Sequence, residues 1–460
     1  MKPGIPQGTR DFGPDTVRKR NYIFDTIKNV FELYGFEPLE TPAMENLETI
    51  SGKYGDEGDR LIFKILNNGL DNPVKKSEAL LDFEKILKGK NVKGITERAL
   101  RYDLTIPFAR YVAMNHAQLA FPFKRYQMQP VWRADRPQRG RYREFYQCDA
   151  DVVGSYSLIN DVELAEVYAE VFKKLKIDVG IKINNRKILA ALAQLCGSPD
   201  KITDITVAID KLDKIGLEKV KEELLLKGIS TEQIVIIQQY LIIDGSNEEK
   251  LNQARNLFQN IVAGKKGIEE LEFILNYMSS GNLKIDFTLA RGLDYYTGII
   301  YEVKAKSVSI GSIGGGGRYD NLTGLFGVPD IPGAGISFGV DRIYDVMEEL
   351  DLFPKEVHQG TKALFFNMGE EESKFAFKQM QWLRSKGISA ELFHEQAKMD
   401  KQFKYATKKN IDFAVIIGSK EIAEKTCVVK QLTQGVQDTI ALTELESYFK
   451  NYYDLEHRVF

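Results

Sequence analysis

The chain has 460 residues, enough for two to four domains with substantial cores. Its net charge of -2 and isoelectric point of about 6.2 exclude a global positive field, so a nucleic-acid partner would have to bind local basic patches. Three scattered cysteines argue against a disulfide framework, and no apolar run approaches a signal core or a membrane span, so we expect a cytoplasmic protein with no membrane partner.

The N-terminal part of the chain predicts a helix, two strands and an exposed excursion. Residues 15–34 carry apolar side chains at helical spacing. A proline-bounded strand is predicted at residues 38–46, and a second strand at residues 61–66. Residues 67–94 are polar and rich in lysine, with a short helical centre, so we expect this segment to project into solvent.

The most informative segment is residues 121–154, where five arginines lie between two stretches that alternate apolar and polar residues. Such alternation predicts strands, and Pro137 and Gly140 stand where a hairpin would turn. Arginine at this density indicates a bound polyanion, because the planar guanidinium matches phosphate oxygens. We therefore predict a hairpin whose ends and loop carry Arg133, Arg136, Arg139, Arg141 and Arg143.

Acidic residues accompany the predicted hairpin. Gln147, Asp149 and Asp151 alternate and so share one strand face, from which they could bind an ammonium group, an imidazole or a metal, or pair with the arginines. Asp103 and Thr105 either lie on one side of a strand or cap the following helix. Without clustered Cys or His, the sequence predicts no zinc site and no nucleophile–histidine pair, so the chemistry should depend on arginines, carboxylates and bound metal.

The second half of the chain predicts a helical insertion and then a return to strands. Residues 187–280 have an almost wholly helical pattern, and strands are predicted at residues 285–289 and 299–303. The glycines at residues 314–317 lack the spacing of a phosphate loop, and we favour a glycine-lined strand that lets a ligand approach the backbone. Beyond residue 360, alternating strands and helices predict a small α/β domain with a largely parallel sheet.

Two more arginines and a group of lysines each allow a functional and a structural interpretation. Arg291, followed by Tyr295 and Tyr296, either binds an anion or forms one structural salt bridge. Arg342 lies at the start of a predicted helix, where its positive charge faces the positive end of the helix dipole. Either a bound phosphate offsets this repulsion, or Arg342 is an ordinary surface arginine. Lysines recur at helical spacing over residues 398–409, and we favour a solvated helix face over a nucleic-acid contact.

Together these segments resemble the motifs of the class II aminoacyl-tRNA synthetases and, within that class, of the histidyl-tRNA synthetase family. GTRDFGP at residues 8–14 is similar to the family's opening, and the first helix with Gly35 and Phe36 resembles motif 1, the dimer element. VWRADRPQRGRYREFYQ resembles motif 2, and GVDRI around Arg342 resembles motif 3. ARGLDYYTG and GGGGRYDNLTGLFG resemble signatures peculiar to the histidine-specific family, and the likeness covers nearly the whole chain.

The resemblance implies a role for each matching residue. The implied catalytic residues are Arg133 and Arg291. ATP, accompanied by Mg²⁺, would be bound by Arg133, Arg141 and Arg342. Histidine would be bound by Asp103, Thr105, Gln147, Asp151, Tyr295, Tyr296 and Tyr319. Contacts with tRNA are assigned to Gln138, Arg139, Lys401 and Lys404, whereas the magnesium ligands are not assigned.

The resemblance also implies an architecture and an activity. We expect an α+β catalytic domain on an antiparallel sheet, formed by residues 1–185 and 281–355, an all-helical insertion at residues 186–280, and a C-terminal α/β anticodon-binding domain at residues 361–460. The implied activity is that of a histidine–tRNA ligase: L-histidine and ATP give histidyl-adenylate and pyrophosphate, and histidine then passes to the 3′ end of tRNA(His), in a homodimer joined through motif 1. The alternative is a non-catalytic, synthetase-like regulatory subunit of histidine biosynthesis.

Overall fold

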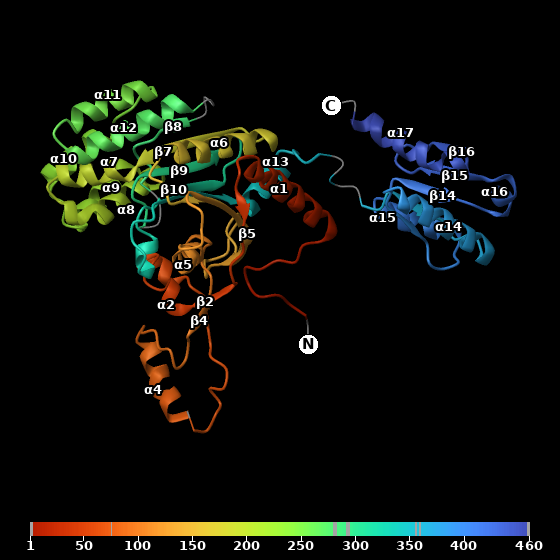
Figure 1. Cartoon of the computed structure of the whole chain (residues 1–460), viewed down its shortest axis with the longest axis horizontal. Helices are drawn as coiled ribbons and strands as arrows, with labels where there is room; N and C mark the ends of the chain where they lie inside the picture. The colour runs from red at the N-terminus through yellow and green to blue at the C-terminus, as the bar shows by residue number, and fades with distance from the viewer. Residues whose placement is uncertain are drawn as a thin grey trace. The chain divides into compact units, whose positions relative to one another are not determined.

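The chain forms two compact units, Met1–Phe353 and Pro354–Phe460, and each unit has its own sheet (Figure 1). The computed structural model describes residues 3–74, 76–278, 283–290, 295–354, 357 and 360–457. Arg291 therefore lies outside the described residues.

The first unit is built on an eight-stranded sheet with the order β1-β5-β6-β11-β10-β9-β7-β8. Its neighbouring strands are antiparallel except in the outer pairs β1–β5 and β7–β8, which are parallel. The strands are Glu37–Pro38 (β1), Phe123–Trp132 (β5), Glu144–Val153 (β6), Val179–Asn185 (β7), Leu283–Ile285 (β8), Ile299–Ala305 (β9), Gly314–Arg318 (β10) and Gly333–Gly339 (β11). The predicted antiparallel sheet and the predicted arginine hairpin, β5–β6, are thus confirmed.

Three helices pack together against this sheet: α1 (Pro14–Leu33), α6 (Ile159–Lys174) and α13 (Val340–Glu349). The apolar stripe of α1 is buried, because Ile23, Ile27 and Val30 point into the core. Phe31 at the end of the stripe meets Phe338 of β11 with ring centroids 5.8 Å apart. This packing fixes β11 and the start of α13, which border the cavity described below.

A second, three-stranded sheet supports the excursion, which extends away from the body of the unit in Figure 1. Its strands are β2 (Met44–Asn46), β4 (Arg98–Leu100) and β3 (Lys64–Ile65), and the nearby helices are α2 (Leu47–Ile50), α3 (Gly55–Arg60), α4 (Lys76–Leu87) and α5 (Thr105–Asn115). The single strand predicted over residues 38–46 is wrong, because residues 39–43 separate β1 from β2, which joins a different sheet.

The insertion between β7 and β8 is helical, as predicted. Its helices are α7 (Arg186–Leu195), α8 (Ile202–Asp210), α9 (Leu212–Leu226), α10 (Thr231–Leu241), α11 (Asn247–Leu257) and α12 (Val262–Tyr277). The strand predicted at residues 285–289 is misplaced, since β8 ends at Ile285. Asp286 turns the chain there: its Oδ1 accepts hydrogen bonds from the backbone N–H of Thr288 at 3.0 Å and from the Thr288 hydroxyl at 2.6 Å.

The second unit has a five-stranded sheet with the order β13-β12-β14-β15-β16. Its elements are β12 (Ala363–Phe365), α14 (Glu370–Ser385), β13 (Ala390–Leu392), α15 (Met399–Lys408), β14 (Phe413–Ile416), α16 (Ser419–Glu424), β15 (Thr426–Gln431), β16 (Gln437–Ala441) and α17 (Leu445–His457). The prediction of a largely parallel sheet holds for β13, β12 and β14 only. β15 and β16 form an antiparallel hairpin, and Gly435 in its turn has φ of 72°.

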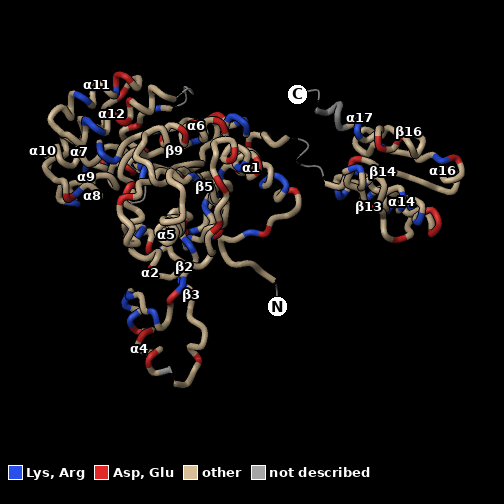
Figure 2. The backbone as a smooth tube through the Cα atoms, viewed as in Figure 1, with Lys and Arg blue, Asp and Glu red and all other residues tan. Residues whose placement is uncertain are grey.

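Charge is mixed over the surface of each unit. Figure 2 shows Lys and Arg interspersed with Asp and Glu along the helices of both units, in keeping with the net charge of -2. The three cysteines are buried, free thiols. Within the described ranges, no helix combines the length and the apolar character that crossing a bilayer requires.

Candidate active site

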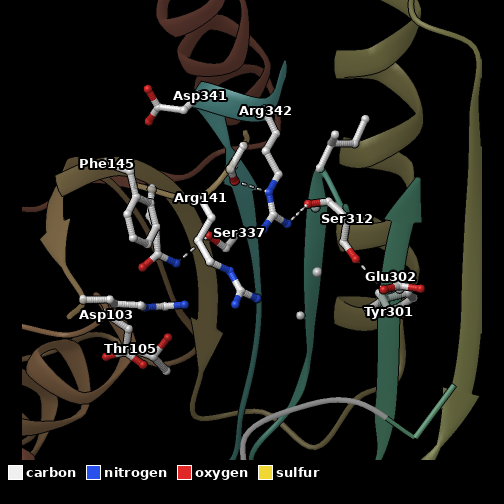
Figure 3. Close-up of a pocket in the computed structure, with 18 of the residues that line it drawn as sticks. Asp103, Thr105, Arg141, Phe145, Tyr301, Glu302, Ser312, Ser337, Asp341 and Arg342 are labelled. Carbon is white, nitrogen blue, oxygen red and sulfur yellow. Dashed lines mark hydrogen bonds between the residues drawn. The ribbon is translucent and has the colours of Figure 1, made fainter. Parts of the chain in front are cut away.

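A cavity of about 340 Å³ lies between the arginine hairpin, the start of α5 and strands β9, β10 and β11 (Figure 3). Segments far apart in the sequence meet there. The predicted site residues that line the cavity are Asp103, Thr105, Arg133, Arg141, Gln147, Tyr295, Tyr296 and Arg342. Asp151 and Tyr319 are buried beside it, Gln138 and Arg139 are exposed on the hairpin loop, and Lys401 and Lys404 belong to the second unit.

The floor of the cavity is the glycine strand β10. Gly314, Gly315 and Gly316 line the cavity between β9 and β11. A Cβ on Gly317 would lie 2.5 Å from the carbonyl oxygen of Ile299, and a Cβ on Gly316 would collide with the backbone of Gly335. These glycines are needed for close strand packing and an open cavity floor, which matches the predicted glycine-lined strand.

A polar cluster on β5 and β6 is buried beside the cavity, which it reaches through Gln147, and we call this side the inner wall. The hairpin register places Arg125 opposite Asp151, and the Arg125 guanidinium lies 2.8 Å from a carboxylate oxygen of Asp151. The Tyr319 hydroxyl donates to the other oxygen of Asp151. A side chain at Gly335 would collide with Asp151, so this glycine makes room for the carboxylate. Because Arg125 and Asp151 are both buried, their pairing is the main compensation for removing two charges from water.

Burial sets the protonation of the acids in this wall. Burial raises the pKa of Asp149 to about 7; Arg125 opposes this shift and Asp151 adds to it. Burial also raises the pKa of Asp151, against the opposing effects of Arg125 and Tyr319. In addition, the partly buried amide of Gln147 donates to the Ser337 hydroxyl at 2.8 Å. The cluster therefore offers several buried acceptors whose negative charge is only partly neutralised.

Asp103 lies two residues before the start of α5 and also lines the cavity. Its Oδ1 accepts hydrogen bonds from the backbone N–H of Ile106 at 3.2 Å and from the Tyr54 hydroxyl at 2.9 Å. Burial raises the pKa of Asp103, while these two hydrogen bonds and Arg133 oppose the shift. The strand interpretation of this segment is wrong, since β4 ends at Leu100. A helix does begin here, at Thr105; its N-cap residue is Leu104, and it is Asp103 that bonds the first turn, through the N–H of Ile106.

Arg133 and Arg141 line the hairpin side of the cavity. The Arg133 guanidinium lies 4.2 Å from the centroid of the Tyr102 ring, and its Nε donates to the Tyr102 carbonyl at 3.1 Å. The aromatic contact holds the guanidinium in place without neutralising its charge. Arg141 is half exposed, and its Nη1 lies 3.5 Å from Asp135.

Arg342 joins two loops at the mouth of the cavity (Figure 3). Its Nε donates to the Gly140 carbonyl and its Nη1 to the Ser312 carbonyl, each at 2.7 Å. The preceding residue, Asp341, is fixed by Arg20 of α1 at 2.6 Å and by the backbone N–H of Tyr146 at 3.2 Å. The start of α13 is thus anchored to both α1 and β6, which orients Arg342 toward the cavity.

Arg125, Ser337 and Glu302 are among the residues near the site that were not identified from the sequence. Arg125 could have been found only from the hairpin register, which puts it opposite Asp151. Ser337 binds Gln147 across β6 and β11, and Glu302 of β9 lines the cavity and accepts a hydrogen bond from Ser312. These contacts join distant segments, and no local pattern in the sequence signals them.

The antiparallel sheet, with its arginine hairpin and the arginine at the start of α13, has the architecture of a class II aminoacyl-tRNA synthetase. The chain belongs to the histidyl-tRNA synthetase family, whose sequence profile matches residues 84–343; an anticodon-binding domain profile matches residues 362–452. The histidine–tRNA ligase of Phocaeicola vulgatus is 54% identical over 453 residues, which cover 98% of this chain and 99% of that protein.

Solved structures agree with this assignment. The structure of a histidyl-tRNA synthetase from Nostoc sp. has a TM-score of 0.81 and 33% sequence identity, and the match covers 98% of this chain and 100% of that chain. A structure described as an ATP phosphoribosyltransferase regulatory subunit/histidyl-tRNA synthetase, from Bacillus halodurans, has a TM-score of 0.69 at 21% identity, covering 90% of this chain and 99% of that chain. The second likeness shows a shared fold alone. The predicted fold and family are therefore confirmed.

Proposed function

We infer that this chain attaches histidine to tRNA(His) in two steps, using ATP, and we propose that both steps occur in the cavity of the first unit. Membership of the ligase family that forms histidyl-tRNA supports the overall reaction. The observation that carries the choice of site is its division into two sides. On one side Gln147 lines the cavity, with the buried carboxylates of Asp149 and Asp151 farther along the same strand; on the other side Arg133 and Arg141 line it. Acceptors suit an ammonium group and an imidazole, and guanidinium groups suit a triphosphate.

In the first step the histidine carboxylate attacks the α-phosphorus of ATP, the bond to the β-phosphate oxygen breaks, and pyrophosphate leaves. In the second step a hydroxyl of the terminal ribose of tRNA attacks the histidyl carbonyl, and AMP leaves. Arg133 stabilises the α-phosphate, and Arg141 and Arg342 hold the distal phosphates. We propose Arg291 as a second catalytic residue, although it lies outside the described residues. Positioning and charge stabilisation supply the catalysis, without a covalent enzyme intermediate.

Histidine is recognised at the inner wall in this proposal. Asp103 and Thr105 bind the amino group together with Gln147, and Asp151, Tyr295, Tyr296 and Tyr319 surround the imidazole. Tyr295 and Thr105 line the same cavity, which supports the closeness of the two subsites. A pocket built to hydrogen-bond both imidazole nitrogens rejects isosteres that lack them by about 10⁴–10⁵, so no editing step is required.

Magnesium enters with ATP in this proposal. Mg²⁺ commonly uses one or two protein carboxylates beside the substrate phosphates. Glu302 faces the cavity, accepts from Ser312 and lies 3.3 Å from the ammonium of Lys304, and we propose that it contributes a ligand. Among the described residues, no three His, Cys, Asp or Glu side chains gather in a way that could hold a metal ion. The ion would supply charge neutralisation to the leaving pyrophosphate.

The remaining partners and boundaries are proposals as well. Residues 1–185 and 281–355 would form the catalytic domain, with the insertion at residues 186–280 and the anticodon-binding domain at residues 361–460. Two surfaces would contact tRNA(His): the exposed hairpin loop with Gln138 and Arg139, and the exposed face of α15 with Lys401 and Lys404. We further propose a cytoplasmic homodimer joined through the motif 1 region.

Histidine-dependent exchange of pyrophosphate into ATP tests this function. We expect exchange with L-histidine and not with the other nineteen amino acids, and charging of tRNA(His) by the same preparation. The regulatory-subunit alternative predicts neither activity from properly folded protein.

Removing residues 361–460 should raise the Michaelis constant for tRNA and leave exchange intact; unchanged charging would contradict the anticodon-binding proposal.

A further inference from the structure

The helical insertion holds both arms of the segment that carries Tyr295 and Tyr296. On the first arm, the Tyr240 hydroxyl of α10 donates to the Phe287 carbonyl at 2.7 Å. The Asn184 amide donates to the Leu289 carbonyl at 2.9 Å and to the Phe287 carbonyl at 3.3 Å. Asn184 belongs to the end of β7, from which the insertion begins, so these bonds connect the insertion and its root to the cavity segment.

On the second arm, the backbone N–H of Arg186, the first residue of α7, donates to the Gly298 carbonyl at 2.8 Å. Gly298 lies two residues after Tyr296 and directly before β9. The described residues of this connection, 286–290 and 295–298, have turn or irregular backbone. Its carbonyls therefore depend on partners outside a strand ladder. The insertion supplies two of these hydrogen bonds, from Tyr240 and Arg186, and Asn184 of β7 supplies the other two.

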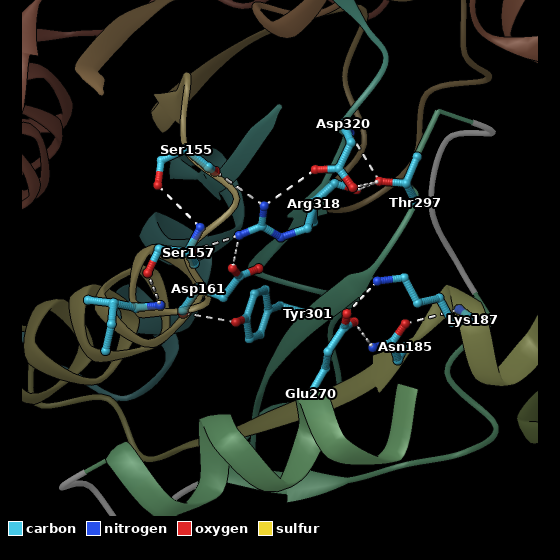
Figure 4. Close-up of polar contacts among 11 residues, drawn as sticks. Ser155, Ser157, Asp161, Asn185, Lys187, Glu270, Thr297, Tyr301, Arg318 and Asp320 are labelled. Carbon is cyan, nitrogen blue, oxygen red and sulfur yellow. Dashed lines mark hydrogen bonds and ion pairs between the residues drawn. The ribbon is translucent and has the colours of Figure 1, made fainter. Parts of the chain in front are cut away.

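Figure 4 shows how firmly the two sides are anchored. On one side, Thr297 donates to Asp320 at 2.8 Å, and Arg318 pairs with the buried carboxylate of Asp161. On the other side, the Asn185 amide donates to Glu270 of α12 at 2.7 Å, and Lys187 pairs with the same carboxylate. The connection thus lies between the catalytic core and an insertion whose root is bonded to α12.

Tyr240 and Asn184 are suited to transmit this anchoring. Both side chains are fully buried, and the Tyr240 ring packs against Phe258 of the insertion and Phe287 of the connection, with centroids 6.1 and 5.5 Å away. Neither residue lines the cavity. We propose that Tyr240 and Asn184 are positioning residues, through which the helical insertion sets the place of the histidine-binding tyrosines.

This inference rests on the proposed function, and the substitution Tyr240→Phe tests it. The change removes one hydroxyl and keeps the packed ring. Losing one such hydrogen bond should raise the Michaelis constant for histidine in pyrophosphate exchange by about three- to tenfold. The constant for ATP should stay within about twofold, because the arginines that hold ATP lie on other elements. The matched control is Tyr277→Phe in α12, whose side chain is 60% exposed; it should match the wild type.

The outcomes separate positioning from mere stability. Positioning is supported if the Michaelis constant for histidine rises and that for ATP does not. The melting temperature should then be unchanged, or should change in a way that does not follow the rise in the Michaelis constant across the variants. Equal rises for histidine and ATP, or wild-type values for Tyr240→Phe, would overturn it. Asn184→Ala removes two donations to the same arm and should give a larger histidine-selective effect; if it does not fold, Tyr240→Phe alone decides. A wild type without histidine-dependent exchange would instead refute the proposed function.

Discussion

The inner and outer walls of the cavity are built in contrasting ways. In the inner wall, Arg125, Asp151 and Tyr319 are buried and bound to one another before any ligand arrives. The outer wall is the hairpin side of the cavity, lined by Arg133 and Arg141, and the Arg141 side chain there is 49% exposed. Arg139, on the same loop but outside the cavity lining, is 62% exposed. The first arrangement is fixed by packing, whereas the second leaves long side chains able to move.

This contrast fits the chemistry proposed for each wall. Choosing one amino acid requires donors and acceptors in set places, because a buried polar group left unpaired is costly. Holding the distal phosphates of ATP, or the end of a tRNA, requires charge that can follow a departing group. Substitutions in the inner wall should therefore affect stability and histidine specificity together, and substitutions in the outer wall should affect one substrate and leave folding unchanged.

The largest effect is expected from Asp151→Asn. The change leaves Arg125 buried without its counter-charge, which should lower the free energy of unfolding by about 3–5 kcal/mol. Histidine-dependent exchange should be nearly lost, while ATP binding by the folded protein persists. Denaturant unfolding and calorimetric titration with ATP and histidine measure these effects.

Two further variants sharpen this test. Asp178→Asn, at an exposed carboxylate paired with Lys306, should leave unfolding and exchange unchanged. The double variant Arg125→Met with Asp151→Leu should recover much of the stability, because an apolar pair can replace a buried ion pair, but not histidine binding. If Asp151→Asn binds histidine normally, the inner wall is not the amino-acid site.

The second-largest effect is expected from Asp149→Asn, and it is a change in stability that depends on pH. The folded-state pKa of Asp149, about 7, is above its ordinary value of 3.8, so between about pH 4 and pH 7 the folded protein binds more protons here than the unfolded chain. The ionisation of this carboxyl therefore lowers the free energy of unfolding more and more as the pH rises through that window. Since each pKa unit corresponds to about 1.4 kcal/mol, the cost reaches up to about 4 kcal/mol above the folded pKa.

Asp149→Asn removes this titration. Its melting temperature relative to the wild type should rise as the pH is raised from about 5 to about 8, and thermal unfolding followed by circular dichroism at several pH values measures the difference. The exposed variant Asp178→Asn provides the baseline. A difference that is constant with pH, or that falls, would show that Asp149 is ionised in the folded protein throughout.

The third-largest effect is expected from Arg141→Ala, and it concerns ATP binding. The half-exposed side chain contributes little to the core, so the melting temperature should not change. The Michaelis constant for ATP in exchange should rise by about tenfold, equivalent to about 1.4 kcal/mol of lost phosphate binding. Arg255→Ala, at a similarly exposed arginine of the insertion, is the matched control. A rise in the histidine constant instead would assign Arg141 to the other wall.

The sequence predicted those parts of the two walls that depend on local patterns. Alternation identified β5 and β6, and the shared face of Gln147, Asp149 and Asp151 followed from it. The partners of that face could not be predicted. Arg125 meets Asp151 only in one hairpin register, and the long loop between the strands leaves that register undetermined from sequence.

The same limit applies to contacts between distant segments. Tyr319 was assigned to the histidine pocket by resemblance, but its bond to Asp151 spans 168 positions. The wrong predictions, in contrast, concerned local structure, namely where a strand ends and where a hairpin forms. β8 ended early because Asp286 bonds its own turn, and the β15–β16 hairpin was overlooked because parallel strands precede it. Periodicity therefore predicts elements well, while turn chemistry and long-range pairing decide where each element ends and what it meets.

The smallest effect is expected from Arg139→Ala in the hairpin loop. Arg139 pairs with Glu349 at an exposed position, and such surface pairs add little to stability, so the melting temperature should be unchanged. If the loop contacts the tRNA backbone, the Michaelis constant for tRNA(His) should rise by about two- to threefold at moderate salt, and the difference should shrink as salt is raised. Exchange without tRNA should match the wild type.

Glu349→Gln distinguishes a tRNA contact from a structural ion pair. This variant breaks the same pair but keeps the arginine, so it should leave the tRNA constant unchanged or lower it, because Arg139 no longer shares its charge with a carboxylate. If Glu349→Gln instead weakens tRNA charging as much as Arg139→Ala does, the pair itself holds the loop in place. The outer wall would then be ordered by its own ion pairs, and its contrast with the inner wall would be one of exposure alone.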